Sequence, residues 1–118
     1  MTFQKLKLDD LPQHYPCRAL TRIAGKDRLI SGGYACDLLS WVISRAGSND
    51  VWFTILNSIN VVAVASLADC ACVMLTENVG MAPEVLKIAE EKGVTILATE
   101  LPTWAASVRL ANLLHQKS

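Results

Sequence analysis

The 118-residue sequence carries little charge and no excess of either sign. Lysine and arginine together number 11, and so do aspartate and glutamate, which leaves a net charge of zero. A chain without a basic surplus has no general electrostatic attraction to nucleic acid or to anionic lipid. We therefore expect neither nucleic acid nor a membrane surface among its partners.

Long hydrophobic runs are also missing. No apolar stretch approaches the roughly 20 residues that span a bilayer, and the start of the chain lacks the basic head, apolar run and cleavage site of a secretion signal. We expect a cytoplasmic protein. The four cysteines lie in apolar or alternating segments, which is typical of reduced core thiols, so we expect no structural disulfide.

Motifs for catalysis and metal binding are sparse. The Gly-Lys pair within Gly25–Asp27 is followed by aspartate and lacks the earlier glycine of a phosphate-binding loop. His14 and His115 lie near opposite ends of the chain, and neither has a neighbouring nucleophile. Cys70 and Cys72 have the spacing of half a metal site without a second pair of ligands. We predict no catalytic activity, no metal and no cofactor, and leave a redox or metal role for these two cysteines open.

The length and the apolar content indicate how the chain is organised. A chain of 118 residues matches one ordinary domain, and we expect a single domain over residues 1–118. Hydrophobic residues make up 52% of the sequence and charged residues only 19%, so apolar surface remains for self-association. We expect a homodimer.

Strand-like and helix-like segments alternate along the chain. Predicted strands are Cys17–Ile23, an extended piece around Leu29 and Ile30 that forms a hairpin or a loosely paired arm with it, Val51–Leu56, Val61–Ala65, Cys72–Leu75 and Val94–Ala98. Predicted helices are a short helix or turn over 3–12, one over 38–46 capped by Asp37, Leu67–Ala71, Pro83–Gly93 and one from Pro102 with Trp104, Val108, Ala111 and Leu114 on its apolar face. This alternation predicts an α/β domain with a mixed or mostly parallel sheet flanked by helices.

The stretch Asp27–Ser40 places charged, hydroxyl and glycine residues in a predicted turn before a helix. A turn at Ser31-Gly32-Gly33 can present backbone amides to a phosphate or carboxylate, helped by Arg28 and the start of the helix. The alternative is that the glycines serve packing and that Arg28 pairs with Asp27 or Asp37. Both interpretations stay open from the sequence.

A second polar group follows a predicted central strand. Thr54, Asn57 and Asn60 lie where strand ends of α/β sheets bind ligands, as does the loop Thr76–Ala82; the alternative for the asparagines is turn capping. Together with the glycine turn they complete the candidate ligand site, which comprises Asp27, Arg28, Ser31, Gly32, Gly33, Asp37, Thr54, Asn57 and Asn60.

The same residues carry a family resemblance. The order Asp-Arg, Ser-Gly-Gly, Tyr and Asp-Leu-Leu-Ser within Asp27–Ser40 resembles the signature of DRTGG domains, small accessory modules of bacterial and archaeal proteins. Val51–Ile55 and Asn60–Ala65 resemble the family's central pair of strands, and Ala89–Val94 resembles its later helix-to-strand turn. The resemblance implies a fold like the N-terminal, non-catalytic domain of HPr kinase/phosphorylase.

Two departures limit what the resemblance implies. Leu29 and Ile30 separate Arg28 from the Ser-Gly-Gly segment, and Leu56–Asn60 lacks the histidine of the family's Gln-x-His-x-Asn segment, so no role of that histidine carries over. The implied function is a regulatory or ligand-sensing module that binds a nucleotide or small phosphorylated metabolite at the Ser-Gly-Gly turn. The alternative is a homodimeric scaffold or assembly protein for a redox or metabolic enzyme, with no metabolite ligand.

Overall fold

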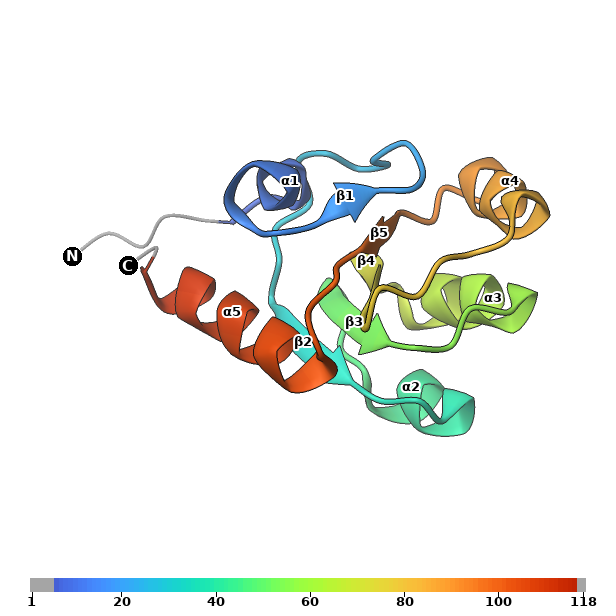
Figure 1. Ribbon diagram of the computed structural model, residues 1–118. Helices are drawn as coiled ribbons and strands as arrows, with labels where there is room; N and C mark the ends of the chain where they lie inside the picture. The colour runs from blue at the N-terminus through green and yellow to red at the C-terminus, as the bar shows by residue number, and fades with distance from the viewer. Residues whose placement is uncertain (1–5, 117–118) are drawn as a thin grey trace.

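The computed structural model describes residues 6–116, which form a five-stranded sheet with helices on both faces (Figure 1). The strands are β1 (Arg18–Ala19), β2 (Gly32–Ala35), β3 (Asp50–Thr54), β4 (Cys72–Leu75) and β5 (Ile96–Ala98). The helices are the 3₁₀-helix η1 (Leu8–Asp10), α1 (Leu11–His14), α2 (Leu39–Arg45), α3 (Ile59–Ala68), α4 (Pro83–Glu91) and α5 (Thr103–Gln116). The predicted α/β fold class is confirmed.

The sheet has the strand order β1-β5-β4-β3-β2. Strands β2 to β5 are parallel, and only β1 runs antiparallel, beside β5. Each parallel connection advances the sheet by one strand in the same direction. Because such crossovers are right-handed, their helices α2, α3 and α4 all lie on one face, while α5 and the N-terminal segment cover the other (Figure 1).

The core has two sides because the central strands are buried on both faces. On β3, Trp52 packs into the layer of α2, α3 and α4, and its neighbour Phe53 packs into the layer of α5. The Trp52 Nε1 donates to the carbonyl of Cys36 at 2.9 Å. On the other side, the Tyr15 hydroxyl donates to the carbonyl of Ala106 at 2.6 Å and joins the N-terminal segment to α5.

The predicted strand Val61–Ala65 is wrong, because these residues lie inside α3. Two parallel neighbours such as β3 and β4 need a crossover of about a dozen residues or more, so the segment between them has to leave the sheet. Most residues of this helix are apolar, and four of its side chains are fully buried, so no helical periodicity shows in the sequence. The predicted helix Leu67–Ala71 is only the end of α3, which stops before Asp69.

The predicted N-terminal hairpin does not form. Of Cys17–Ile23, only Arg18 and Ala19 pair in the sheet, and their partner is β5. Leu29 instead makes an isolated bridge with Lys7. The described part of the helix predicted over 3–12 is η1 and the first residues of α1; residues 3–5 lie outside the described part.

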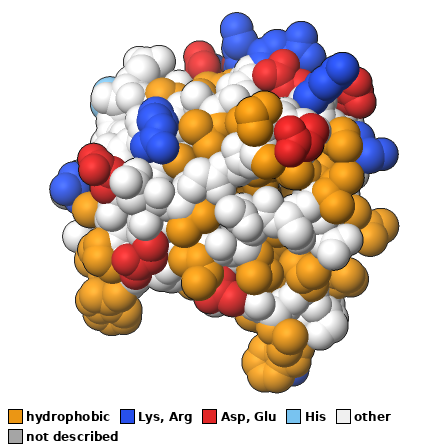
Figure 2. All heavy atoms as spheres, turned by 45° about the vertical axis from the view of Figure 1, so that its right-hand side comes forward, with side chains coloured by type: hydrophobic (Ala, Val, Ile, Leu, Met, Phe, Trp, Pro, Cys, Tyr) orange, Lys and Arg blue, Asp and Glu red, His pale blue; other side chains and the backbone are white. Residues whose placement is uncertain are grey.

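The face of α5 next to solvent differs from the predicted one. On α5, Trp104 is 80% exposed, whereas Ala106 and Leu110 face the sheet. On α2, Val42 is buried while Trp41 and Ile43 are about half exposed. Figure 2 shows hydrophobic side chains gathering in the lower half of one face, on the side of α2, and charged ones near the top, on the side of α4. Within residues 6–116, no helix has the length and apolar character that crossing a membrane requires.

Candidate functional site

The nine predicted site residues lie at opposite ends of the sheet. Asp27, Arg28 and Ser31 precede β2 and lie at the amino ends of the parallel strands. Asp37, Thr54, Asn57 and Asn60 lie at or beyond the carboxyl ends of β2 and β3. Gly32 and Gly33 are inside β2, between the two groups. The structure therefore divides the predicted single site into two clusters.

Arg28 makes several hydrogen bonds at the amino end. Its Nε and Nη2 donate to Asn49 Oδ1 at 2.8 and 2.6 Å, and Nη2 also donates to the carbonyl oxygen of Asp69 at 2.7 Å and to its Oδ1 at 3.2 Å. Asn49 and Asp69 both have positive φ, 69° and 57°, so the guanidinium holds two left-handed turns in place. Arg28 thus pairs with neither Asp27 nor Asp37, and Asp27 instead pairs with Lys7 at 3.5 Å.

The predicted turn at Ser31-Gly32-Gly33 is wrong, because Gly32 and Gly33 are part of a strand. Neither has the positive φ that a tight glycine turn uses. A Cβ on Gly33 would lie 3.0 Å from Phe53 Cε2 and 3.2 Å from Leu110 Cδ2. The packing interpretation of Gly33 is therefore the one that the structure supports, since its missing side chain lets α5 lie close to β2.

The sequence predicted that Asp37 caps α2. In the structure Asp37 instead joins the ends of β2 and β3. Helix α2 has Leu38 at its N-cap and no side-chain cap. The Asp37 Oδ1 accepts the Thr54 hydroxyl at 2.7 Å and the amide of Ile55 at 3.0 Å. Thr54 is fully buried and Asp37 is exposed. The carboxylate is thus held at the surface by contacts that leave it facing solvent.

The next loop completes this carboxyl-end cluster. Asn57 Nδ2 donates to the carbonyl of Gly80 at 2.9 Å, so the loops after β3 and β4 are joined. Asn60 lies exposed in the first turn of α3, where backbone amides lack helical partners. Leu38, Ile55 and Ile59 are each about half exposed beside these polar groups. A carboxylate, amides and apolar side chains therefore share one rim.

Sheets of this class bind ligands where adjacent loops diverge to opposite faces. In this sheet the loops after β4 and β5 diverge in this way, because α4 and α5 lie on opposite faces. Glu77 and Asn78 donate their amides to the carbonyls of Leu101 and Thr99 at 2.9 and 3.0 Å, and the hydroxyls of Thr76 and Thr103 share a 2.7 Å bond. These hydrogen bonds hold the two loops together at the point where they diverge. The start of the predicted loop site Thr76–Ala82 is therefore tied to its neighbour instead of open.

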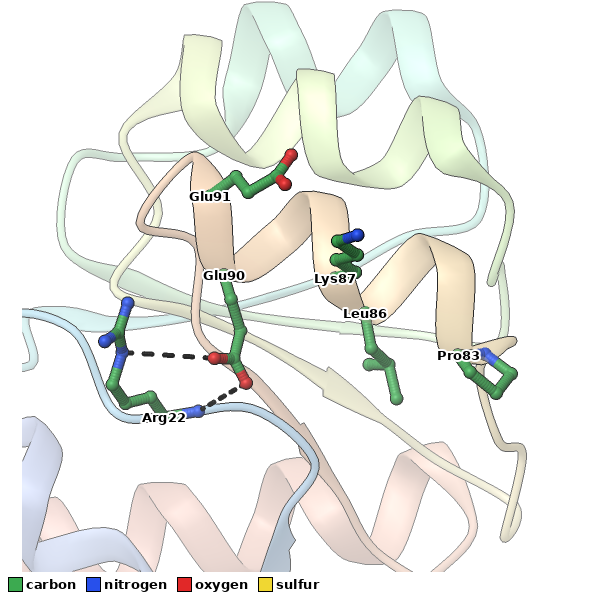
Figure 3. A pocket seen from close by; sticks show the side chains of 6 residues that line it. All are labelled: Arg22, Pro83, Leu86, Lys87, Glu90 and Glu91. Atoms are coloured by element: carbon green, nitrogen blue, oxygen red, sulfur yellow. Dashed lines mark hydrogen bonds and ion pairs between the residues drawn. The ribbon is translucent and has the colours of Figure 1, made fainter.

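A further hollow lies along α4. It is a groove of about 520 Å³ between α4 and the loop after β1, and Figure 3 shows the six residues that line it, none of which is among the predicted site residues. Arg22 Nε lies 4.0 Å from Glu90 Oε1, and the Arg22 amide donates to Glu90 Oε2 at 3.4 Å. No local motif marks this groove, because it joins residues far apart in the chain. Its opposite charges partly neutralise one another.

The thiols of Cys17, Cys70 and Cys72 are not activated. Burial raises the pKa of Cys17 and of Cys70 to about 11, and it also raises the pKa of Cys72. Such groups are protonated at neutral pH and are poor nucleophiles and metal ligands. All four cysteines are free thiols, and residues 6–116 hold no cluster of three or more metal-ligating side chains.

Gly33→Ala tests the packing role of the glycine. The new methyl group has to displace Phe53 and Leu110, so we expect a loss of about 1–3 kcal/mol in the free energy of unfolding. In the matched control Gly32→Ala, the Cβ meets only the Asp50 carboxylate at 3.3 Å, and we expect a change within about 1 kcal/mol. Urea unfolding of both variants measures the difference, and equal effects would contradict the packing role.

Arg28→Ala removes the guanidinium that holds the turns at Asn49 and Asp69. Because it leaves a half-buried amide oxygen of Asn49 without its donor, we expect a loss of about 1–3 kcal/mol in unfolding free energy. The control Arg109→Ala removes an exposed arginine of α5 and is expected to cost less than about 0.5 kcal/mol. Thermal and urea unfolding check both; a neutral Arg28 variant would refute the role.

Asp69 makes stability depend on acid pH. The hydrogen bond from Ser48 at 2.7 Å and the charge of Arg28 lower its pKa in the folded state. The contribution is therefore complete above the ordinary aspartate pKa and is lost as the pH falls through the lower folded value. Wild type is expected to exceed Asp69→Asn in unfolding free energy at about pH 6, and this difference is expected to shrink as the pH falls below about 4. A difference independent of pH would contradict this.

Comparison with known proteins places this geometry in a family. A solved structure with the same fold is the crystal structure of the CBS and DRTGG domains of the regulatory region of a Clostridium perfringens pyrophosphatase, complexed with its activator diadenosine tetraphosphate; the TM-score is 0.71 at 12% identity. The alignment covers 88% of this chain and 45% of that one, so this chain spans less than half of its length. At this identity the likeness shows the fold alone.

The family itself is shown by the sequence. No curated protein matches the chain. The DRTGG domain model, however, matches residues 40–113, which is more than half of the chain. The match begins at the last residue of the Asp27–Ser40 stretch, so it rests on the segments from α2 to α5 and not on the glycine segment. The chain therefore belongs to the DRTGG domain family.

Proposed function

We propose that this chain is a non-catalytic regulatory module that senses a nucleotide or small phosphorylated metabolite. Membership of the DRTGG family supports a regulatory role, since the similar solved structure is part of a regulatory region whose activator, diadenosine tetraphosphate, is a dinucleotide. The observation that carries the proposal is the carboxyl-end cluster: Asp37 and Thr54 bond to each other across the ends of two neighbouring strands, and Asn57 and Asn60 follow in the next loop and in the first turn of α3.

The cluster offers a different contact to each part of a nucleotide. The Asp37 carboxylate repels phosphate and accepts hydrogen bonds from ribose hydroxyls, as acidic residues at strand ends do in dinucleotide folds. The half-exposed Leu38 and Ile55 can cover a base. The first amides of α3, beside Asn60, favour phosphate because the start of a ten-residue helix carries partial positive charge. Arg28 has no part, since it lies at the opposite end of the sheet.

The test is calorimetric titration of the full chain with diadenosine tetraphosphate, ATP and AMP. Asn60→Asp adds a negative charge in the first turn of α3, where it stabilises the helix and repels phosphate. We expect at least about tenfold weaker binding with no loss of thermal stability. Asp37→Asn keeps an oxygen for Thr54 and Ile55 but removes the charge. We expect weaker nucleotide binding, because the contact with the nucleoside part is weakened.

The matched control is Asp27→Asn, which changes an aspartate at the amino end and is expected to bind like wild type. Absence of saturable heat with all three nucleotides would refute nucleotide sensing. Wild-type affinity in both Asn60→Asp and Asp37→Asn would place the ligand elsewhere and refute this site.

A second candidate is an assembly protein for a redox or metabolic enzyme. It is favoured by the half-exposed apolar side chains Leu38, Trp41, Ile43, Ile55 and Ile59, which surround the same rim and α2. Scattered exposed apolar residues are ordinary, but a contiguous group marks a protein contact. The titration separates the candidates, because an assembly protein without a metabolite ligand gives no saturable heat.

A further inference from the structure

The outer edge of β2 has no partner strand among residues 6–116. β2 pairs with β3 along its inner side. The amide of Cys36 donates toward β3, to the carbonyl of Phe53, at 3.1 Å. Because backbone groups alternate in direction along a strand, Tyr34 and Gly32 also turn inward, while Gly33 and Ala35 turn their N–H and C=O groups to the open side. An edge of this kind is a template for another strand.

This edge lacks the features that usually block strand addition. Proteins protect open edges with lysine, other charges or proline, whereas β2 reads Gly-Gly-Tyr-Ala. Gly33 and Ala35 are exposed, and neither has a side chain large enough to keep another backbone away. The edge is therefore both unpaired and open to close approach.

An apolar groove runs beside the same edge. It has a volume of about 320 Å³ between β2 and α5. Its lining includes Gly33, Ala35, Phe53, Leu110, Ala111 and Leu114, and no lysine, arginine, aspartate or glutamate. A partner that adds a strand to β2 also covers this groove, so backbone pairing and apolar burial act together.

We propose that the partner is a second copy of this chain, with the two β2 strands paired antiparallel around a twofold axis at Tyr34. The outward residues Gly33 and Ala35 lie symmetrically about Tyr34. Each Gly33 then faces Ala35 of the other copy and exchanges a pair of hydrogen bonds with it. Tyr34 faces itself at the close, non-hydrogen-bonded position of the ladder, where Cα atoms approach to about 4.5 Å. The edge is therefore complementary to itself, as a twofold interface requires.

The helices on this side have to supply most of the contact. A specific interface buries about 1,200–2,000 Å² in total, which is more than a four-residue edge provides. The twofold brings the two α5 helices together over the groove and covers Ala111 and Leu114, and no charged group in the lining opposes this. The contact goes beyond the proposed ligand site and uses none of its residues.

The contact is tested by measuring the mass of the full chain by light scattering as it elutes from a size-exclusion column, at several concentrations. We expect wild type at twice the 12.8 kDa mass of one copy. Ala111→Glu places two like charges in the covered groove and is expected to weaken the dimer at least about tenfold. The control Asn112→Glu adds the same charge to the next residue of α5, which is also exposed but does not line the groove, and it is expected to stay dimeric.

Amide hydrogen exchange tests the strand pairing itself. In the dimer we expect slow exchange at Gly33 and Ala35, and in monomeric Ala111→Glu fast exchange at both, while Tyr34 stays protected by β3 in either state. A monomeric wild type would overturn the proposal. So would a dimer that Ala111→Glu leaves intact, or one in which the Gly33 and Ala35 amides exchange fast.

Discussion

The structure depends on one constraint, the need of parallel strands for a crossover between each pair. β2, β3, β4 and β5 are parallel and adjacent in chain order, so α2, α3 and α4 have to fill the connections, and their common hand places them on one face. The other face is then left without a crossover helix. The N-terminal segment and α5 cover it, and the hydrogen bond from Tyr15 to Ala106 joins them.

This arrangement decides where chemistry is available. The loops that diverge, after β4 and β5, are closed by hydrogen bonds between Glu77, Asn78 and their neighbours. The carboxyl ends of β2 and β3 stay accessible. There the Asp37 carboxylate is held by Thr54 and is exposed. At the opposite end, Arg28 is occupied by Asn49 and Asp69. The two clusters therefore differ in kind: the one at the amino ends stabilises turns, and the one at the carboxyl ends faces solvent.

The elements with distinct local signals were predicted well. Cys72–Leu75 is a strand with the expected bounds, and the helix from Pro83 is followed by a strand that ends at Ala98. Proline at a helix start and short β-branched runs are local signals that act through backbone geometry and packing. Val61–Ala65 was misassigned because a buried helix and a buried strand are both continuously apolar. The positions of the candidate site residues were only partly predictable: Asp37, Thr54, Asn57 and Asn60 lie at the carboxyl ends of β2 and β3, but Arg28 lies at the opposite end of the sheet.

The sequence by itself determined the class of the domain, its family and most of its regular elements, since alternating apolar periods and turn residues act over short distances in the chain. Tertiary structure alone decided that the Ser-Gly-Gly segment is an edge strand, because the φ angles of Gly32 and Gly33 follow from pairing with β3 and from the close approach of Leu110. It also decided the partners of Arg28 and of Asp37. A side chain's partner depends on which segments fold beside it, and Asn49, Asp69 and Thr54 are 17 to 41 residues away in the chain.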